Sequence, residues 1–347
     1  MEDEIINSVI TIVGSINYDL VTYISSIPDA GETKQSNSFE THFGGKGLNQ
    51  AISTSKLIPR LEKTRIKIQM CGNVGDDSFG MDLEKYLVKN TINIENVKNL
   101  TGTNTGVAVI IVEEDSNGEN RILITPGANA KTLPTNEEYE KLFNITDKDI
   151  KQYVILQNET PNTVETINWL HTNRPNINII YNPSPFIDLP SEIYKKIDVL
   201  VVNETEALMS ANDMLKDEKL RDFKEEIAKD KISGFHKLAT TLRQLINLDK
   251  LNLVIITLGS TGSLYSSKES GDDLKFFKSN KIPKDKVKDT TGAGDTFLGA
   301  IVSQLSLGNS IDSAMKFAIY ASSLTVQKKG AAETIPVYED VAKLLKD

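Results

Sequence analysis

Five short apolar runs rich in β-branched residues limit most strongly what this chain can fold into. They are VITIV, YVIL, INIIY, DVLVV and LVIIT, at residues 9–13, 153–156, 177–181, 198–202 and 253–257. Runs of this length, separated by segments with helical patterns, are typical of strands that are buried on both faces of a parallel sheet. We therefore predict an α/β fold with a doubly wound, mostly parallel central sheet and helices on both faces.

Polar or small residues follow each of these runs directly, in the segments GSINYD, QNET, NPSP, NETE and LGSTGS. Ligands of open parallel sheets bind at the carboxyl ends of the strands, so the five segments predict one long crevice. Turns between a strand and a helix also favour Gly, Asn, Pro and Ser for backbone reasons, which is the alternative explanation for any one segment. Asp19, Glu159 and Glu206 place a carboxyl group in three of the segments, and this favours the crevice.

Two further regions indicate strands outside the parallel sheet. Residues 105–129 contain two apolar runs on either side of DSNGEN, where Asn117-Gly118 is a strong hairpin-turn signal. The segments 19–28 and 34–45 have the pattern of a second extended pair. We interpret both pairs as a small lid over the crevice, formed by about residues 18–45 and 103–126 of a single domain that spans residues 1–347. Periodicity alone also allows them to extend an edge of the main sheet.

Charge and composition exclude several classes of partner. The net charge is −9 without a block of Lys or Arg, so we expect neither nucleic acid nor a membrane as a partner. The apolar runs are short and the N-terminus is acidic, so we expect a cytoplasmic location, or a cytoplasmic and nuclear one. The one cysteine, Cys71, is expected in the core, and the three histidines lack the spacing of metal ligands. The charged segment 204–250 has alternating charge signs and predicts solvated surface helices.

The stretch DTTGAGDTF, residues 289–297, places three small residues directly before a carboxylate. Apolar Phe297, Ile301 and Leu305 then recur every four residues, which predicts an amphipathic helix that begins at the small residues. Unpaired backbone N–H groups and the positive end of the helix dipole make such a helix start a site for an anion, and glycine lets the anion approach the backbone. Asp295, in the first turn, is then either a helix-capping residue or a base that acts on something bound at the same place.

Three common nucleotide-binding motifs are absent from the sequence. GGKGLNQA, residues 44–51, is not a P-loop, because Glu40 and Gly47 stand where that motif requires a glycine and a Ser or Thr. VGSIN lacks the three-glycine fingerprint of dinucleotide-binding folds, and the HRD and DFG triplets of protein kinases do not occur. If the chain handles phosphate, the GAGD segment is its predicted anion site.

Two long motifs and several short ones occur in a fixed order along the chain. GGKGLNQA lies near the N-terminus and DTTGAGDTFLGA near the C-terminus; GSINYD precedes the first, TGVA, GAN, NPSP, NETEA and TLGSTG lie between them, and KKGAAETIP follows the second. In this order the motifs resemble the ribokinase branch of the ribokinase/PfkB-type carbohydrate kinases over nearly the whole chain, and fungal members most. The resemblance implies the fold predicted above, with a β-lid that closes on the sugar and often forms a homodimer contact. The charged stretch near 212–250 is longer than in compact bacterial members.

The resemblance implies transfer of a phosphoryl group from ATP to O5 of D-ribose. Asp295 matches the catalytic base, which takes the proton of the sugar 5-hydroxyl as that oxygen attacks the γ-phosphate. The amides of Gly292, Ala293 and Gly294 match the anion hole, so the base touches the nucleophile while the amides hold the electrophile. The positions that match ribose-binding residues of the family are Asn17, Asp19, Gly45, Lys46, Asn49, Glu159 and Asp295.

The resemblance also implies a nucleotide site and two cation sites. Mg²⁺ would be held mainly by phosphate oxygens and waters, with Glu206 nearby. A potassium site beside the anion hole would be built mostly from backbone carbonyls, with Thr334 in place of the more frequent serine. The matching nucleotide positions are Asn203, Glu206, Thr257, Gly259, Ser260, Gly262 and Gly294, and the matching potassium positions are Asp289, Thr291, Thr325, Lys328, Gly330 and Thr334.

Two other functions stay open at this point. A nucleoside or another sugar as the acceptor keeps the fold and the chemistry, although GSINYD together with GGKGLNQ favours ribose. A catalytically silent protein that only binds sugar or nucleotide would be expected to have lost Asp295 or the anion hole, and both are intact.

Overall fold

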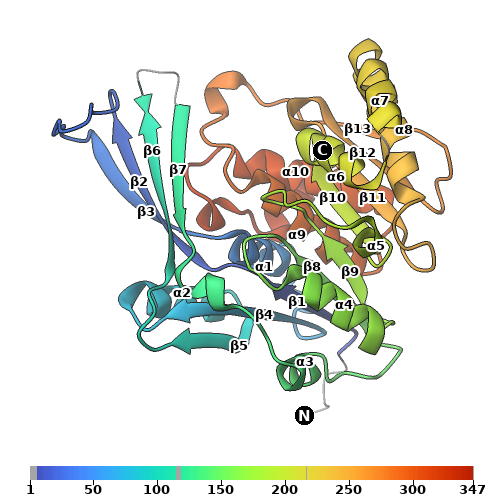
Figure 1. Ribbon diagram of the computed structural model, residues 1–347, viewed down its shortest axis with the longest axis horizontal. Helices are drawn as coiled ribbons and strands as arrows, with labels where there is room; N and C mark the ends of the chain where they lie inside the picture. Colours follow the sequence, from blue (N-terminus) through green and yellow to red (C-terminus); the bar gives the residue numbers. More distant parts are fainter. Residues whose placement is uncertain (1–5, 115–118, 216, 347) are drawn as a thin grey trace.

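The computed structural model describes residues 6–114, 119–215 and 217–346, and in this part of the chain nine strands form the main sheet (Figure 1). Their spatial order is β13 (Lys275–Lys278), β12 (Gly262–Ser267), β11 (Leu253–Thr257), β10 (Val199–Asn203), β9 (Asn178–Tyr181), β8 (Lys151–Leu156), β1 (Ser8–Val13), β4 (Ile66–Gly75) and β5 (Asn93–Leu100). Neighbours from β11 to β5 are parallel, whereas β12 and β13 are antiparallel additions at one edge. The predicted sheet is confirmed, and the five apolar runs lie side by side in it.

Helices cover both faces of this sheet, as predicted. Side chains alternate along each buried strand, so Leu253 and Ile255 of β11 join one core while Val254 and Ile256 join the other. The first core includes α1 (Lys46–Lys56), α2 (Ser78–Lys89), α9 (Ala293–Ser306), α10 (Ile311–Thr325) and α11 (Tyr338–Leu344). The second includes α3 (Asn136–Leu142), α4 (Thr163–Asn173), α5 (Ser191–Tyr194), α6 (Glu204–Met214), α7 (Asp217–Lys229) and α8 (Lys231–Arg243).

Helix α9 differs from the prediction in its burial. We predicted an amphipathic helix, but every residue from Asp295 to Ser306 is buried, because α1 and α10 both pack against α9. A Cβ on Gly299 would come within 2.3 Å of Ser53 Oγ of α1, and the same hydroxyl donates a hydrogen bond to the carbonyl of Thr296 (3.0 Å). This close crossing brings the first turns of α1 and α9 together.

A second, small sheet stands apart from the main sheet (Figure 1). Its strands, in spatial order, are β3 (Ser38–Gly44), β2 (Asn17–Ile24), β6 (Gly106–Glu113) and β7 (Glu119–Thr125). β3 pairs with β2 and β6 with β7 in antiparallel fashion, while β2 and β6 are parallel neighbours. The two predicted extended pairs are thus confirmed, and the alternative in which they extend the main sheet is wrong. The predicted Asn117-Gly118 turn lies outside the described residues.

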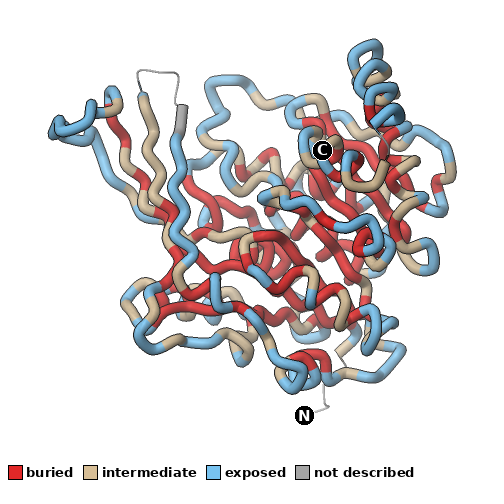
Figure 2. The backbone as a smooth tube through the Cα atoms, in the orientation of Figure 1, coloured by how far each residue is buried: buried red, intermediate tan, exposed pale blue. Residues whose placement is uncertain are grey.

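The charged segment 204–250 forms helices α6 to α8, which differ in burial. Among the described residues of α7, Leu220 alone is buried, and Figure 2 shows the helix at the periphery of the molecule. The prediction of a surface helix is therefore confirmed for α7. For α8 it is only half right, since Phe235, Leu238 and Leu242 of that helix belong to the core. No helix in the described ranges is long and apolar enough to cross a membrane.

Candidate active site

The N-terminus of α1 is pressed against the loop that follows β1. Gly45 precedes the helix with a φ of 87°, in the left-handed region that favours glycine. A Cβ on Gly47 would come within 2.7 Å of the backbone of Gly14 and Ser15, so no larger residue fits there without a shift of backbone. The positive φ explains the glycine at position 45 and the close contact the glycine at position 47, and this contact fixes the first turns of α1 at the carboxyl end of β1.

The carboxylate of Asp295 is held from across the site by α1. Its Oδ2 accepts a hydrogen bond from Asn49 Nδ2 (3.0 Å), and its Oδ1 accepts one from Gln50 Nε2 (2.9 Å). The N-cap of α9 is Gly292, which has no side chain to cap the helix. The capping alternative for Asp295 is therefore wrong, because both of its oxygens bond to side chains of another helix. Gln50 was not among the predicted site residues.

The three small residues before Asp295 form the start of α9. Gly292 has a φ of 73°, and Ala293 and Gly294 line a cavity of about 920 Å³. A Cβ on Gly294 would meet no atom within 4 Å, so the backbone faces open space there. The dipole of this 14-residue helix favours negative charge at that end. The structure thus places a helix start that favours negative charge in the wall of a large cavity, next to a buried carboxylate.

The large cavity lies at the carboxyl ends of β10 and β11. Of the predicted nucleotide residues, those that line it are Asn203, Thr257, Gly259, Ser260, Gly262 and Gly294. Glu206 does not line it. Its carboxylate accepts the N–H of Asn203 (3.0 Å), and Asn203 Oδ1 accepts the N–H of Glu206 (2.9 Å), which is a capping box at the start of α6. Sequence reasoning missed apolar residues of the wall, among them Phe297 and Ile319, since their pattern is that of any core residue.

Several charged side chains lie close together between the end of β1 and the small sheet. Burial raises the pKa of Asp19 to about 7, and repulsion from carboxylates, first that of Glu159, adds to the effect. Glu159 accepts the backbone N–H of Lys46 (2.8 Å) at the positive end of α1, and also the hydroxyl of Ser15. Burial by itself lowers the pKa of Lys46, but nearby carboxylates, first that of Asp295, outweigh it and raise the pKa. One ammonium group among several carboxylates suits a ligand with many hydroxyl groups.

Three asparagines complete this part of the site. Asn17 Oδ1 accepts a hydrogen bond from Asn129 Nδ2 (2.7 Å), and Asn129 also bonds to both backbone groups of Ile16. Asn129 belongs to the GAN motif and was not predicted as a site residue. The second polar atom of Asn49, Oδ1, is buried and has no hydrogen-bond partner among the described residues. A buried acceptor without a partner costs free energy until a ligand supplies a donor.

Three of the predicted potassium residues line a second cavity, of about 410 Å³, between the small sheet and the start of α9. They are Asp289, Thr291 and Gly330, and Asp19 lines the same cavity. The carboxylate of Asp289 accepts the N–H groups of Thr291 (2.9 Å) and Gly330 (3.1 Å). It therefore ties the segment before α9 to the segment after α10.

The other three predicted potassium residues do not line this cavity. The hydroxyl of Thr334 donates to the carbonyl of Ala331 (2.6 Å), that of Thr325 bonds to the hydroxyl of Thr296 (3.0 Å), and Lys328 is exposed. In the described ranges, no group of three or more His, Cys, Asp or Glu side chains could hold a metal ion.

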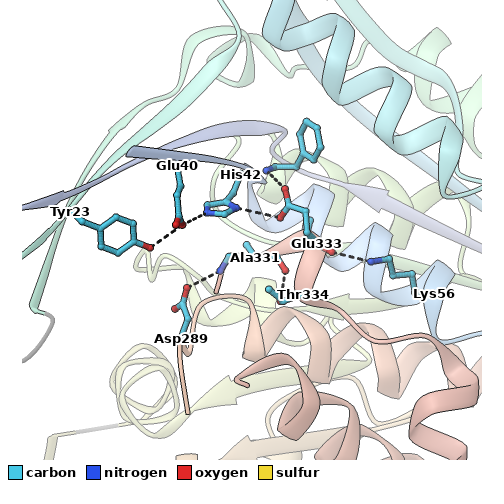
Figure 3. A network of polar contacts seen from close by, with 11 residues as sticks. Tyr23, Glu40, His42, Lys56, Asp289, Ala331, Glu333 and Thr334 are labelled. Atoms are coloured by element: carbon cyan, nitrogen blue, oxygen red, sulfur yellow. Dashed lines mark hydrogen bonds and ion pairs between the residues drawn. The ribbon is translucent and has the colours of Figure 1, made fainter. Parts of the chain in front are cut away.

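A polar network joins strand β3 of the small sheet to the segment around Thr334 (Figure 3). His42 lies between two carboxylates, with Nε2 3.3 Å from Glu40 and Nδ1 3.9 Å from Glu333. Glu333 also accepts the backbone N–H of Phe43 (2.8 Å). The small sheet is thus fastened to the segment that Asp289 holds from the other side.

The chain is similar to known carbohydrate kinases in both sequence and structure. The chain matches the model of the pfkB family carbohydrate kinases over residues 8–337. It is 34% identical to ribokinase of Schizosaccharomyces pombe over 94% of both chains, and 33% identical to ribokinase of Lactococcus lactis over 97% of both. A structure of Arabidopsis thaliana ribokinase complexed with ribose and ATP is 27% identical with a TM-score of 0.76, covering 99% of this chain and 100% of that one. Ribokinase of Cryptococcus neoformans in complex with ADP is 26% identical with a TM-score of 0.74, covering 97% and 99%.

Proposed function

The chain belongs to the pfkB family of carbohydrate kinases, and from this premise we propose that it transfers the γ-phosphoryl group of ATP to O5 of D-ribose. The observation that carries the proposal is the position of Asp295. Its carboxylate bonds to Asn49 of the GGKGLNQ motif, while Ala293 and Gly294, directly before it, line the large cavity. A base in this position lies between a site for the sugar and a site for the transferred phosphate.

In the proposed reaction Asp295 accepts the proton of the ribose 5-hydroxyl. The bond from O5 to the γ-phosphorus forms as the bond from that phosphorus to the bridging oxygen breaks, which gives D-ribose 5-phosphate and ADP. The amides of Gly292, Ala293 and Gly294 donate hydrogen bonds to the oxygens of the transferred group. Support for these roles is the helix start that the three residues form beside the carboxylate.

ATP would occupy the large cavity, whose volume of about 920 Å³ lies within the range usual for cofactor sites. Ribose would bind among Asp19, Lys46, Asn49 and Glu159. A sugar hydroxyl would supply the donor that Asn49 Oδ1 lacks among the described residues. Carboxylates and an ammonium group together can satisfy hydroxyls both as donors and as acceptors.

Two cations complete the proposal. Mg²⁺ would enter with ATP, bound mainly by phosphate oxygens and waters, and would neutralise charge on the phosphates. Potassium would bind beside Asp289, whose carboxylate holds two backbone segments face to face. Carboxylate and backbone carbonyl oxygens are hard ligands, which suit an alkali ion. Thermal unfolding in K⁺ against tetramethylammonium, without substrates, tests the potassium site, and equal midpoints would contradict it.

We also propose that the chain forms a homodimer through the small sheet. Strand β7 is one of the two edge strands of that sheet, and its Ile122, Leu123 and Ile124 are 53%, 64% and 53% exposed. An exposed apolar edge strand is a place where a second chain can pair.

A substrate panel tests the proposed function. ADP release would be followed with purified protein, Mg-ATP and each of ribose, deoxyribose, fructose, adenosine and no sugar, with and without K⁺. We expect turnover that depends on ribose and is stimulated by K⁺, with ribose 5-phosphate as the product identified by NMR. Turnover that depends on adenosine alone would overturn the assignment of ribose, and tight binding of ribose and ATP without product would overturn the enzyme.

A further inference from the structure

Two buried glutamines lie behind Asp295, and the proposed function gives neither of them a role. Gln50 is the fifth residue of α1, and Gln157 directly follows β8. Gln50 Nε2 donates to Asp295 Oδ1 (2.9 Å), and Gln157 Nε2 donates to Gln50 Oε1 (2.6 Å). Their relative exposures are 0% and 1%. Three side chains from α1, α9 and the end of β8 therefore form one hydrogen-bonded chain that ends at the proposed base.

The chemistry of the amide groups gives this chain a direction. A carboxylate can only accept hydrogen bonds, so the nitrogen of Gln50 has to face Asp295. Gln157 Nε2 donates a hydrogen bond to Gln50 Oε1 and so holds the Gln50 amide in that orientation. A rotated Gln50 amide would place two acceptors against each other at Asp295 and two donors against each other at Gln157. Gln50 Nε2 is also 3.3 Å from Asn182 Oδ1, so a second acceptor faces the same nitrogen.

The neighbouring residue Asn49 holds the other oxygen of the carboxylate (3.0 Å). Asn49 and Gln50 of α1 thus donate one hydrogen bond to each oxygen of Asp295, and together they fix the plane of the carboxylate. Gln50, with an exposure of 0%, lines neither cavity, so it acts on the reaction only through Asp295.

Stability alone does not account for these glutamines. Gln157 Oε1 is buried and has no hydrogen-bond partner within the described part of the chain. An unpaired buried acceptor lowers stability, and an apolar side chain of similar size would avoid that penalty. The hydrogen-bonded glutamines are present although Gln157 Oε1 is unpaired among the described residues, and this indicates that they serve a function at Asp295, where the chain of hydrogen bonds ends.

We propose that Gln157 and Gln50 are positioning residues that hold the carboxylate of Asp295 in the orientation for proton transfer from the sugar hydroxyl. This inference rests on the proposed function, in which Asp295 is the base. Gln157 acts through Gln50, and Gln50 acts through Asp295. Small errors in the placement of a catalytic group lower turnover by factors of up to about 100, so the relay should influence kcat far more than the binding of ATP.

The test compares Gln50→Met, Gln157→Met and the double variant. Methionine keeps the length of the side chain and removes both hydrogen-bonding groups. We expect kcat to fall about 10- to 100-fold for Gln50→Met and less for Gln157→Met, with KM for ATP within about twofold of wild type. The double variant should have the kcat of Gln50→Met, because loss of Gln157 has no effect once Gln50 is gone.

Gln304→Met is the matched control. Gln304 is also buried and belongs to the same helix as Asp295, but its oxygen accepts from Asn309 Nδ2 (2.8 Å), away from the site. This variant should change thermal stability while kcat stays within about twofold of wild type. If Gln50→Met does not fold, Gln50→Leu replaces it, since that change also fills the site with an apolar side chain and removes the N–H donors to Asp295.

The outcomes separate this inference from the proposed function. Wild-type protein that makes no ribose 5-phosphate would overturn the function itself. A kcat for Gln50→Met or Gln50→Leu within twofold of an active wild type, or single effects that multiply in the double variant, would overturn the relay and leave the function standing. A kcat loss in Gln304→Met equal to that of Gln50→Met would also overturn it, because the effect would then be one of general packing.

Discussion

Ribose affinity should depend on pH through Asp19, whose pKa burial raises to about 7. Ribose hydroxyls donate more strongly to an ionised carboxylate than to a neutral carboxyl group, so binding favours the ionised form. With a pKa of about 7, about 90% of Asp19 is ionised at pH 8 and about 10% at pH 6. The Kd for ribose should therefore rise about tenfold between pH 8 and pH 6, which is about 1.4 kcal/mol.

Calorimetric titration of ribose without ATP measures this effect. Binding near pH 7 should release protons, so the apparent enthalpy should change with the ionisation enthalpy of the buffer. Asp19→Asn should bind ribose more weakly at pH 8 and show no slope between pH 6 and pH 8. Glu333→Gln removes one of the carboxylates that raise the pKa of Asp19 and should move the midpoint to lower pH. A Kd for ribose that does not change with pH in the wild type, or a pH dependence that persists in Asp19→Asn, would show that Asp19 does not control ribose affinity.

The same residue should also reduce the stability of the fold. The pKa of Asp19 in the folded chain lies above its ordinary value of 3.8, so its contribution to the free energy of unfolding falls as the pH rises from about 4 to about 7. The rise to about 7 corresponds to a loss of at most about 4 kcal/mol at pH 8. Asp19→Asn should accordingly unfold at a higher temperature than wild type at pH 8, as is usual for a group held in place for binding.

Three further predictions concern packing, reactivity and assembly. Gly47→Ala should lower the free energy of unfolding in urea by about 2 kcal/mol or more, because its Cβ would collide with backbone, while Gly294→Ala should unfold like wild type; equal midpoints for both would contradict the close contact. Burial raises the pKa of the Cys71 thiol to about 12, so iodoacetamide should label it at pH 8 only after unfolding, and rapid labelling of native protein would count against its place in the core. Ile122→Asp combined with Ile124→Asp should turn a dimer into a monomer in light scattering, and a wild type that is already monomeric would exclude the proposed dimer.

The sequence predicted the centre of the main sheet better than its edges. Buried parallel strands are apolar along their whole length, and this pattern is visible in β1, β8, β9, β10 and β11. The edge strand β5 reads NIENVKNL and β13 has four residues, so neither has an apolar run to recognise. Helix α9 was located correctly, but its complete burial depends on α1 and α10, which no local pattern reveals.

The residues of the candidate site were predicted from motifs, and motifs do not show which side chains contact one another. The structure brings Asn49 and Asp295, 246 residues apart in sequence, into hydrogen-bond contact, as a shared site requires. Gln50 stands inside GGKGLNQA and Gln157 in the QNET segment, but a glutamine in such a segment does not show which partner it holds. Glu206 was predicted near the phosphates, whereas the structure uses its carboxylate to cap α6. A role near Mg²⁺ and a cytoplasmic location both stay predictions.

The most direct test of the account is a rapid-quench measurement of ribose 5-phosphate formation by wild type and Asp295→Asn, together with the Kd for ATP of each. The wild type should form ribose 5-phosphate. For Asp295→Asn we expect a rate lower by about 10²- to 10⁴-fold with an ATP affinity within about twofold, because the amide cannot accept the proton while the large cavity is unchanged. Product formation by Asp295→Asn at the rate of the wild type would contradict the assignment of Asp295 as the base, and with it the mechanism built around that carboxylate.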